Sequence, residues 1–344
     1  MYQRESIVLI SLFVISAITS TVYALPKGPF YLPALCVSET IRTVPAFVEA
    51  DEHKTNKIIM KTTFRWVNLW AYHVESEEQF NWQSSDPDTF PFEYGSYLVD
   101  VEIYTLNNRI SYQVLNNLSI EMSIPVHHYG GGSMDGLIEG FHDMFGLGQH
   151  NRTNAERDET NLFFVDRNDT ILYNGDHISG SYLGNCEIGG ALNIFQGAHN
   201  ATMRFLLKLP TSQEESLFDQ NSFDMTLQGL YTWHKGRWSG YHAVSLTRFG
   251  SDGNGAIDFY RIRGATMNTF EYRVSNEMSF ILQTSAASAI GDYPEFDSPI
   301  IETTLGFKHK LHYGVLEFGL IENLFFFDNS PDFGVHLGYS VGFL

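Results

Sequence analysis

A run of acidic, histidine and aromatic side chains in the middle of the chain is the first candidate for chemistry. It contains Asp135, Glu139, Phe141, His142, Asp143 and Phe145. On a helix, Glu139 and His142 share one face because they are three positions apart, and a carboxylate beside an imidazole suits a metal ion. Two ligands do not complete such a site, so we favour structural hydrogen bonding by His142 and Asp143. We therefore predict neither a metal ion nor a cofactor.

Lipid hydrolysis at a membrane surface is a second chemistry to weigh, and it needs a serine nucleophile beside a histidine base. His242 and Ser245 are close in sequence. On a strand, however, a separation of three residues places two side chains on opposite faces. We therefore do not expect an enzyme, and a surface lipid hydrolase is the least favoured alternative.

Charged side chains of both signs form the third candidate group, because they recur on one side of segments that alternate in polarity. They are Arg65, Arg109, Glu121, Glu187, Arg204, Lys208, Asp224, Glu271, Arg273, Glu302 and Lys308. On the strands of a membrane barrel, the polar face points to the interior. There such residues meet passing solutes if the lumen is wide, or pair across it if the lumen is narrow. We predict that these residues line a lumen.

Alternation with a period of two residues runs from residue 58 to the end of the chain and is the basis of the fold prediction. In the last segment, Phe333 and Val335 alternate with Gly334 and His336. Short turns alternate with longer polar loops, which is typical of outer-membrane barrels. The predicted fold is an all-β antiparallel transmembrane β-barrel of about twelve strands, with both ends in the periplasm. The expected strands are 58–71, 101–114, 118–128, 181–195, 200–210, 222–235, 237–250, 262–274, 277–287, 299–309, 312–326 and 332–344.

The N-terminus has the pattern of an exported protein. Arg4 precedes an apolar stretch at 7–18, and residues 22–24 fit a signal-peptidase site. The apolar stretch is too short to span a bilayer, because a helical span needs roughly 20 apolar residues. We therefore predict that residues 1–24 are a cleaved signal peptide. Residues 25–57 are then either a periplasmic segment or a plug that enters the lumen of a barrel formed by 58–344.

The formal net charge of the chain is −19. This acidic balance argues against nucleic acid as a partner. Part of the charge lies in expected loops, such as 75–78 and 86–88, where acidic side chains are solvated or bind divalent cations. Cys36 and Cys186 can pair in an oxidising periplasm, but their spacing gives no evidence of contact, so the pairing stays open.

The longest expected connection, about 129–180, is the segment to which we assign function. Loops longer than about 15 residues are often functional. Met134, Leu137 and Ile138 fall at helical spacing after Ser133, which predicts a short amphipathic helix. The apolar face of this helix then constricts the barrel, lies on the outer leaflet or packs on other loops.

Within this loop, residues 135–147 read D-G-L-I-E-G-F-H-D-M-F-G-L. This block resembles the pattern D-G-x-I-E-x-[FW]-H-x-x-F-G-L of an uncharacterised bacterial envelope family, the domain of unknown function 3187. Looser similarity extends to 112–125, 208–210 and 331–332, whereas Gly148 stands where the family usually has proline. The resemblance implies an outer-membrane or periplasmic setting and no assigned activity.

Together these features predict a porin-like, monomeric barrel in the bacterial outer membrane, surrounded by lipid and lipopolysaccharide. The aromatic strand at the C-terminus fits the signal by which such barrels are inserted, although Leu344 follows Phe343. The predicted function is a channel or binding barrel for a small solute, gated by the 129–180 loop. The alternative is a closed structural or interaction barrel that presents acidic outer loops. An open lumen favours the channel, and a charge-paired, plugged lumen favours the alternative.

Overall fold

The described part of the protein covers most of the expected strands. In the computed structural model it consists of residues 27–33, 42–52, 57–73, 95–146, 157–158, 160–165, 171–172, 179–212, 222–251, 258–293, 296–322 and 333–343. The predicted signal peptide, Cys36 and the acidic segments 75–78 and 86–88 lie outside these residues. What the sequence indicates about them therefore stays a prediction.

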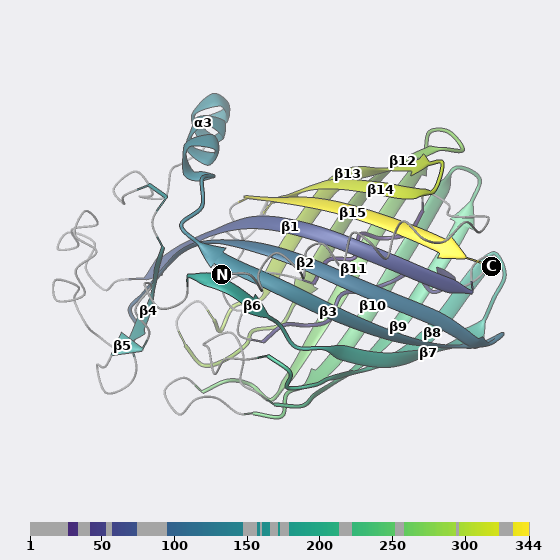
Figure 1. Ribbon diagram of the computed structural model, residues 1–344, viewed down its shortest axis with the longest axis horizontal. Helices are drawn as coiled ribbons and strands as arrows, with labels where there is room; N and C mark the ends of the chain where they lie inside the picture. Colours follow the sequence, from purple (N-terminus) through teal and green to yellow (C-terminus); the bar gives the residue numbers. More distant parts are fainter. Residues whose placement is uncertain are drawn as a thin grey trace, which may run out of the picture.

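The described strands form one antiparallel sheet that closes into a barrel, because β1 pairs with both β2 and β15 (Figure 1). The ring they form has 12 strands, with β6 and β7 as two parts of one strand that pairs with β3. The ring consists of β1 (Ile58–His73), β2 (Tyr97–Leu115), β3 (Leu118–Gly130), β6 (Gly180–Leu183), β7 (Glu187–Phe195), β8 (His199–Lys208), β9 (Asp224–Lys235), β10 (Trp238–Arg248), β11 (Ile262–Arg273), β12 (Met278–Ala287), β13 (Ile300–Leu311), β14 (Gly314–Glu322) and β15 (Phe333–Phe343). Each overlaps an expected strand, and the predicted fold is confirmed.

The two faces of the wall differ in polarity, because successive side chains of a strand point to opposite faces. On β10, Val244 and Leu246 are 62% and 55% exposed, whereas Ser245 and Thr247 are 8% and 0% exposed. Apolar side chains thus face outward and polar ones face the lumen. This arrangement suits a barrel that is surrounded by lipid.

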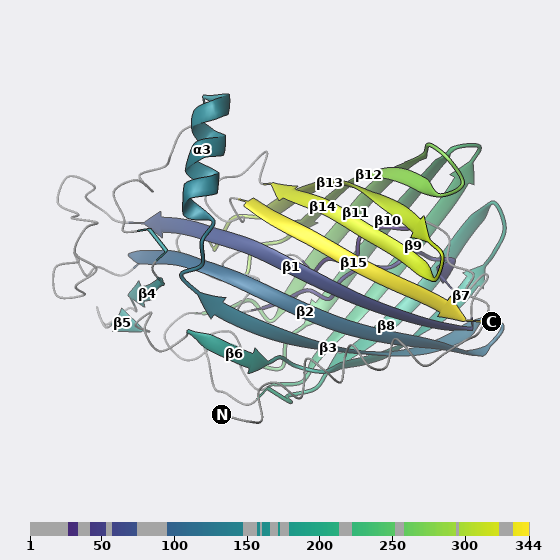
Figure 2. The same ribbon diagram turned by 45° about the horizontal axis from the view of Figure 1, so that its top comes forward.

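The connections at the two ends of the barrel differ in length. Short turns join β2 to β3 and β9 to β10 at the end where β15 finishes and β1 begins (Figures 1 and 2). There Ile58 lies opposite Phe343. We call this the turn end, and we call the opposite end, with the longer connections, the loop end. The predicted topology assigns the turn end to the periplasm.

The long connection between β3 and β6 contains one helix and two short strands. α3 (Asp135–Phe145) stands away from the wall at the loop end (Figure 2). β4 (Asn161–Val165) pairs with β2 beyond the point where β3 ends, and β5 (Ile171–Leu172) pairs with β4. β4 therefore continues the wall at this end. Among the described residues, no helix has the length and apolar character needed to cross a membrane.

Residues 27–33 and 42–52 lie inside the ring of strands, and we call them the lumenal segment (Figure 1). One apolar cluster joins Phe30 to lumen-facing residues of β1 and β2. A second cluster joins Tyr31 and Val48 to lumen-facing residues of β9 and β10. The core of the molecule is therefore built between the wall and a segment of the same chain.

Candidate functional site

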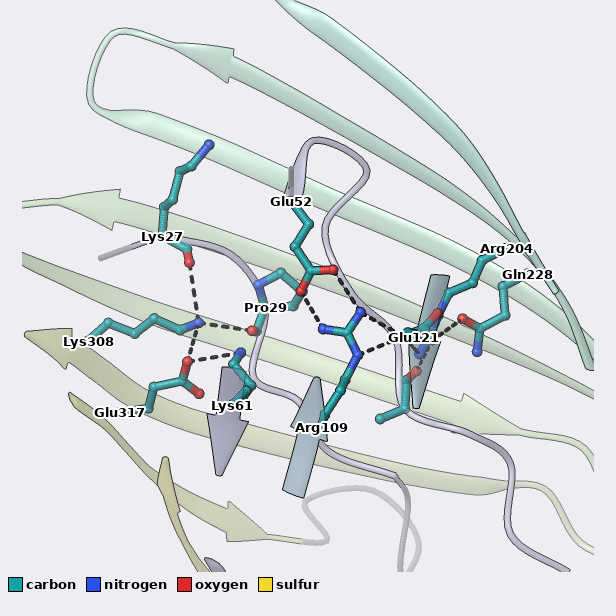
Figure 3. Close-up of polar contacts among 11 residues, drawn as sticks. Lys27, Pro29, Glu52, Lys61, Arg109, Glu121, Arg204, Gln228, Lys308 and Glu317 are labelled. Carbon is teal, nitrogen blue, oxygen red and sulfur yellow. Dashed lines mark hydrogen bonds and ion pairs between the residues drawn. The ribbon is translucent and has the colours of Figure 1, made fainter. Parts of the chain in front are cut away.

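The first group of charges in the lumen centres on Glu121 of β3, which lies between two arginines (Figure 3). Arg109 Nε and Arg204 Nε approach its carboxylate oxygens at 2.7 and 2.5 Å. Both arginines also bind the lumenal segment. Arg109 donates to the two carboxylate oxygens of Glu52 at 2.5 and 2.7 Å, and Arg204 donates to the carbonyl of Ala46 at 2.6 Å. Because hydrogen bonds between charged groups are strong, this group fixes the segment to the wall.

The second group centres on Glu317 of β14. Lys61 Nζ and Lys308 Nζ lie 3.0 and 2.9 Å from its Oε1, and His336 Nε2 lies 3.3 Å from its Oε2. Lys308 also donates to the carbonyl of Pro29 at 3.0 Å, so this group binds the lumenal segment as well (Figure 3). The predicted lining omitted Lys61, Glu317 and His336. The alternation of their strands is the signal that places them on the lumen face.

The third group lies near the turn end and joins the two parts of the lumenal segment. Asp51 Oδ2 is 3.0 Å from both Lys27 Nζ and His234 Nε2. Burial raises the pKa of Asp51, but the hydrogen bond with His234 and the charge of Lys27 outweigh it and lower this pKa to about 2. Beside this pair, Gly28 lies against the carboxyl group of Glu49, and burial raises the pKa of Glu49. The two parts of the segment thus form one packed unit.

Most of the other residues predicted to line the lumen make contacts there. Contacts are made by Arg65 with the carbonyl of Pro33, by Glu187 with Ser123, by Lys208 with Asp224, and by Glu271 with Tyr241. Glu302 is 6% exposed. Arg273, in contrast, is exposed at the turn end, where β11 finishes, and donates to the carbonyl of Gly236 at 2.9 Å.

At the loop end, aromatic and aliphatic side chains meet at the mouth of the barrel. We call them the mouth cluster: Tyr97 of β2, Leu162 and Phe164 of β4, and Tyr293 and Phe296 of the connection between β12 and β13. The ring centroids of Phe164 and Phe296 are 5.5 Å apart, and those of Tyr97 and Phe164 are 5.7 Å apart. All five are at most 2% exposed. The sequence analysis missed this cluster, because β4 and the connection are too short to carry a periodic signal.

The start of α3 is anchored on the outer face of the wall by Glu102 of β2. This carboxylate is 0% exposed. It accepts hydrogen bonds from Trp66 Nε1 at 2.6 Å, from the Tyr104 hydroxyl at 2.9 Å and from the main-chain N–H of Ser133 at 2.7 Å. The N–H of Met134 donates to it as well. The carboxylate therefore occupies the N-terminal end of the helix, where main-chain N–H groups have no partner within the helix.

Asp135 and Glu139, two of the predicted loop residues, brace the same connection. Asp135 accepts hydrogen bonds from Asn68 Nδ2 at 3.4 Å and from the main-chain N–H of Asp158 at 2.8 Å. Glu139 forms an ion pair with Arg157. Because Asn68 belongs to the outer face of β1, these contacts lie outside the lumen.

Of the other predicted residues of α3, the structure describes the side chain of Asp143. Asp143 is exposed, and the side chains of Phe141, His142 and Phe145 lie outside the described part of the molecule. In the residues that the structure describes, no group of three or more His, Cys, Asp and Glu side chains is arranged to hold a metal ion. The hydrogen-bonding role of His142 stays a prediction.

A comparison with protein families relates nearly the whole chain to one group. The family model described as a protein of unknown function (DUF3187) matches residues 6–343. The chain belongs to this family. The resemblance indicated by the 135–147 block is thereby confirmed. A search of curated proteins found no match.

Solved structures supply the second comparison. The COG4313 outer membrane channel from Pseudomonas putida F1 is similar with a TM-score of 0.53 and 11% identity, over 84% of this chain and 96% of that chain. The Pseudomonas putida toluene transporter TodX is similar with a TM-score of 0.42 and 9% identity, over 92% of this chain and 95% of that chain. Because only 11% of the residues are identical, the similarity to the COG4313 channel shows a shared fold and no more. The fold of this family member is thus that of an outer-membrane channel barrel.

Proposed function

We propose that this protein is a channel for a small solute in the bacterial outer membrane, and that the lumenal segment closes it in this structure. The observation that carries the proposal is the fold that the ring shares with a solved outer membrane channel. The lumenal segment, which the ring encloses, accounts for the closed state. A ring of about twelve strands is intermediate between filled and open barrels, so a lumen of this size can conduct once such a segment moves.

Three features support the outer-membrane location. Apolar side chains cover the outer face of the wall, as on β10 and β12, where Leu246 and Phe280 are 55% and 49% exposed. The solved structure with the same fold carries the description of an outer membrane channel. The first residues have the pattern of a signal peptide, as expected for an exported protein. We further propose that the barrel is a monomer in contact with lipid and lipopolysaccharide.

The 129–180 connection contributes to the proposed gate through β4. Leu162 and Phe164 of β4 pack in the mouth cluster against Tyr293 and Phe296. If the connection moves away from the mouth, Leu162 and Phe164 leave it together, because β4 carries both side chains. An apolar mouth also favours a solute with an apolar part, since water is displaced from such a surface at little cost.

A closed barrel with a structural role is the second candidate function, and the ion pairs of the lumen favour it. Glu121 and Glu317 each contact two cations from other strands. Pairs of this kind tie adjacent and next-but-one strands of the wall together on its lumen face. They also hold the lumenal segment, so both candidates account for them.

Single-channel conductance in a planar bilayer separates the two candidates. The proteins to compare are the full-length protein, a variant lacking 27–52 and a variant lacking 133–147. We expect small or rare steps from the first and larger, more frequent steps from the variant without the lumenal segment. The variant lacking 133–147 tests the loop, and we expect it to open the mouth by releasing β4.

Folding is checked for each protein by the change of its gel mobility on heating. Silence from all three folded proteins would leave the structural barrel as the function. Equal conductance from all three would mean that neither the lumenal segment nor the loop obstructs the pore.

A further inference from the structure

We infer that the lumen is a binding site for a peptide main chain, and that the lumenal segment occupies this site in the present structure. The inference goes beyond the channel proposal, because it concerns what the wall recognises and not whether the barrel conducts. The wall binds the segment largely through main-chain atoms. Another peptide offers those atoms when it adopts the same conformation, with a glycine at the position of Gly28, where φ is 97°.

Two residues of the segment have both main-chain groups paired with the wall. The N–H of Phe30 donates to Gln283 Oε1 at 2.8 Å, and Gln283 Nε2 donates to the Phe30 carbonyl at 3.3 Å. The N–H of Ala50 donates to Thr232 Oγ1 at 3.0 Å, and Thr202 Oγ1 donates to the Ala50 carbonyl at 2.7 Å. In both cases the partners are side chains of the wall, because the strands that carry them are already paired with a strand on each side.

Further main-chain groups of the segment are bound one at a time. Five carbonyls of the segment accept hydrogen bonds from side chains of the wall. Lys308 donates to the carbonyls of Lys27 and Pro29, Arg263 to that of Arg42, Gln228 to that of Pro45, and Arg204 to that of Ala46. The N–H of Gly28 donates to the Tyr241 hydroxyl at 3.0 Å and to Glu271 Oε2 at 3.1 Å. The contacts come from β8, β9, β10, β11, β12 and β13, so much of the ring takes part.

Two successive aromatic side chains of the segment contact different parts of the wall. Phe30 packs edge-on against His336 with ring centroids 5.3 Å apart. The next residue, Tyr31, belongs to the other apolar cluster and lies with its ring 5.5 Å from the guanidinium carbon of Arg109. The main chain turns here, because the N–H of Leu32 donates to the carbonyl of Phe30 at 3.0 Å. The two aromatic residues are therefore held by two parts of the wall.

A peptide fits this site better than an anionic solute does. An anion supplies acceptors and would satisfy the donors of Arg204, Arg263 and Lys308. It has no N–H for Gln283 Oε1, which would keep only the hydroxyl of Thr269 at 3.2 Å. Its charge would also be repelled by Glu271, whose carboxylate receives the N–H of Gly28. Each N–H of the segment therefore adds a hydrogen bond that an anion cannot supply, so the wall is complementary to amide groups.

Binding of a short peptide in trans tests the inference. The protein is the variant lacking 27–52, and the probe is a fluorescent peptide with the sequence of residues 27–33. We expect saturable binding by anisotropy. A matched peptide with an ester in place of the Phe30 amide lacks one N–H and keeps every side chain, and we expect about tenfold weaker binding. Equal binding of the two peptides would overturn the inference, as would full displacement by an equal concentration of phenylbutyrate, an apolar carboxylate without an amide.

The full-length protein provides the second test, which decides the question if the deletion variant does not fold. Gln283→Leu removes the side chain that pairs with Phe30. Gln113→Leu is the matched control, because Gln113 bonds to the carbonyl of Asn116 near the turn end. We expect hydrogen exchange of residues 27–33 to rise about tenfold in Gln283→Leu and to stay unchanged in Gln113→Leu. Equal exchange in both would show that the wall does not hold the main chain.

The outcomes separate this inference from the channel proposal. If the barrel binds the peptide but never conducts, the peptide-binding inference holds and the channel proposal is wrong. If the barrel conducts but does not bind the peptide, the channel proposal holds and the peptide-binding inference is wrong.

Discussion

Two buried carboxylates on neighbouring strands, Glu121 in the lumen and Glu102 on the outer face, are satisfied in different ways. Glu121 lies between Arg109 and Arg204, at 2.7 and 2.5 Å. Glu102 receives hydrogen bonds from uncharged donors: an indole, a phenol and two main-chain N–H groups. The lumen therefore uses opposite charges to tie strands and the lumenal segment together. The outer face uses an acceptor to position the start of a helix.

Removing Glu121 is expected to have the largest effect. In Glu121→Ala, Arg109 and Arg204 lose the carboxylate between them, while both stay buried. We expect the free energy of unfolding to fall by about 3 to 5 kcal/mol, because an uncompensated buried charge is costly. Urea unfolding of the refolded barrel in detergent measures this.

Glu277→Ala is the control for this experiment, because Glu277 is exposed in a turn between β11 and β12. We expect it to change stability by less than about 0.5 kcal/mol. A Glu121→Ala protein as stable as this control would mean that the charge group does not tie the wall together.

Changing Glu102 is expected to act on the loop and to leave the ring intact. In Glu102→Gln, an NH2 group replaces one acceptor oxygen and faces donors that stay buried. We expect a local loss of about 1 to 3 kcal/mol, the cost of unsatisfied buried groups. Limited proteolysis between residues 133 and 158 should become faster, while the unfolding midpoint of the barrel should hardly move.

Gly132→Ala tests the same anchor from the side of the loop. Gly132 has a φ of 73°, and an added Cβ would lie 1.8 Å from the carboxyl carbon of Glu102. We expect the same increase in proteolysis as in Glu102→Gln. If the whole barrel unfolds earlier in both variants, the anchor belongs to the core of the fold and not to the loop.

The difference between the two carboxylates also explains what could be predicted from the sequence. Glu121 was placed in the lumen because its neighbours alternate in polarity, and alternation is the physical requirement of a wall between lipid and lumen. Glu102 lies on the outward face, where the same rule expects an apolar residue. A charged residue that breaks the alternation is therefore the sequence signal for a contact with something outside the wall.

The strands were predictable because a period of two is repeated along more than ten segments of the ring, so errors at single positions matter little. The mouth cluster was not predictable, because Leu162, Phe164, Tyr293 and Phe296 meet only once the ring brings β4 and the β12–β13 connection together. For residues 25–57 the sequence offered two locations. The composition of this stretch does not indicate which side chains of the wall it contacts, so the sequence did not distinguish the two locations.

Acidification is expected to loosen the lumenal segment at the turn end. The pKa of Asp51 is lowered to about 2, below the ordinary value of about 3.9 for an aspartate. A lowered pKa contributes stability that is fully present above pH about 4 and is lost as the pH falls toward 2. We expect this loss to reach roughly 1 to 2 kcal/mol, measured as faster hydrogen exchange of 42–52.

Asp51→Asn is the control for acidification. It should show raised exchange of 42–52 already at neutral pH and a smaller change between pH 4 and 2. If its pH dependence matches that of the unchanged protein, another group controls the release of the segment.

Arg109→Lys is expected to have the smallest effect and separates charge from geometry in the lumen. Lysine keeps the positive charge beside Glu121 but lacks the guanidinium fork that donates to both oxygens of Glu52 at 2.5 and 2.7 Å. We expect the barrel to lose about 1 kcal/mol, because one charged contact is kept and a bidentate one is lost. Exchange of 42–52 should rise more than that of 27–33, because Glu52 loses two hydrogen bonds whereas Tyr31 loses only a contact of its ring with the guanidinium. A loss as large as that of Glu121→Ala would mean that the fork, and not the charge, ties the lumen together.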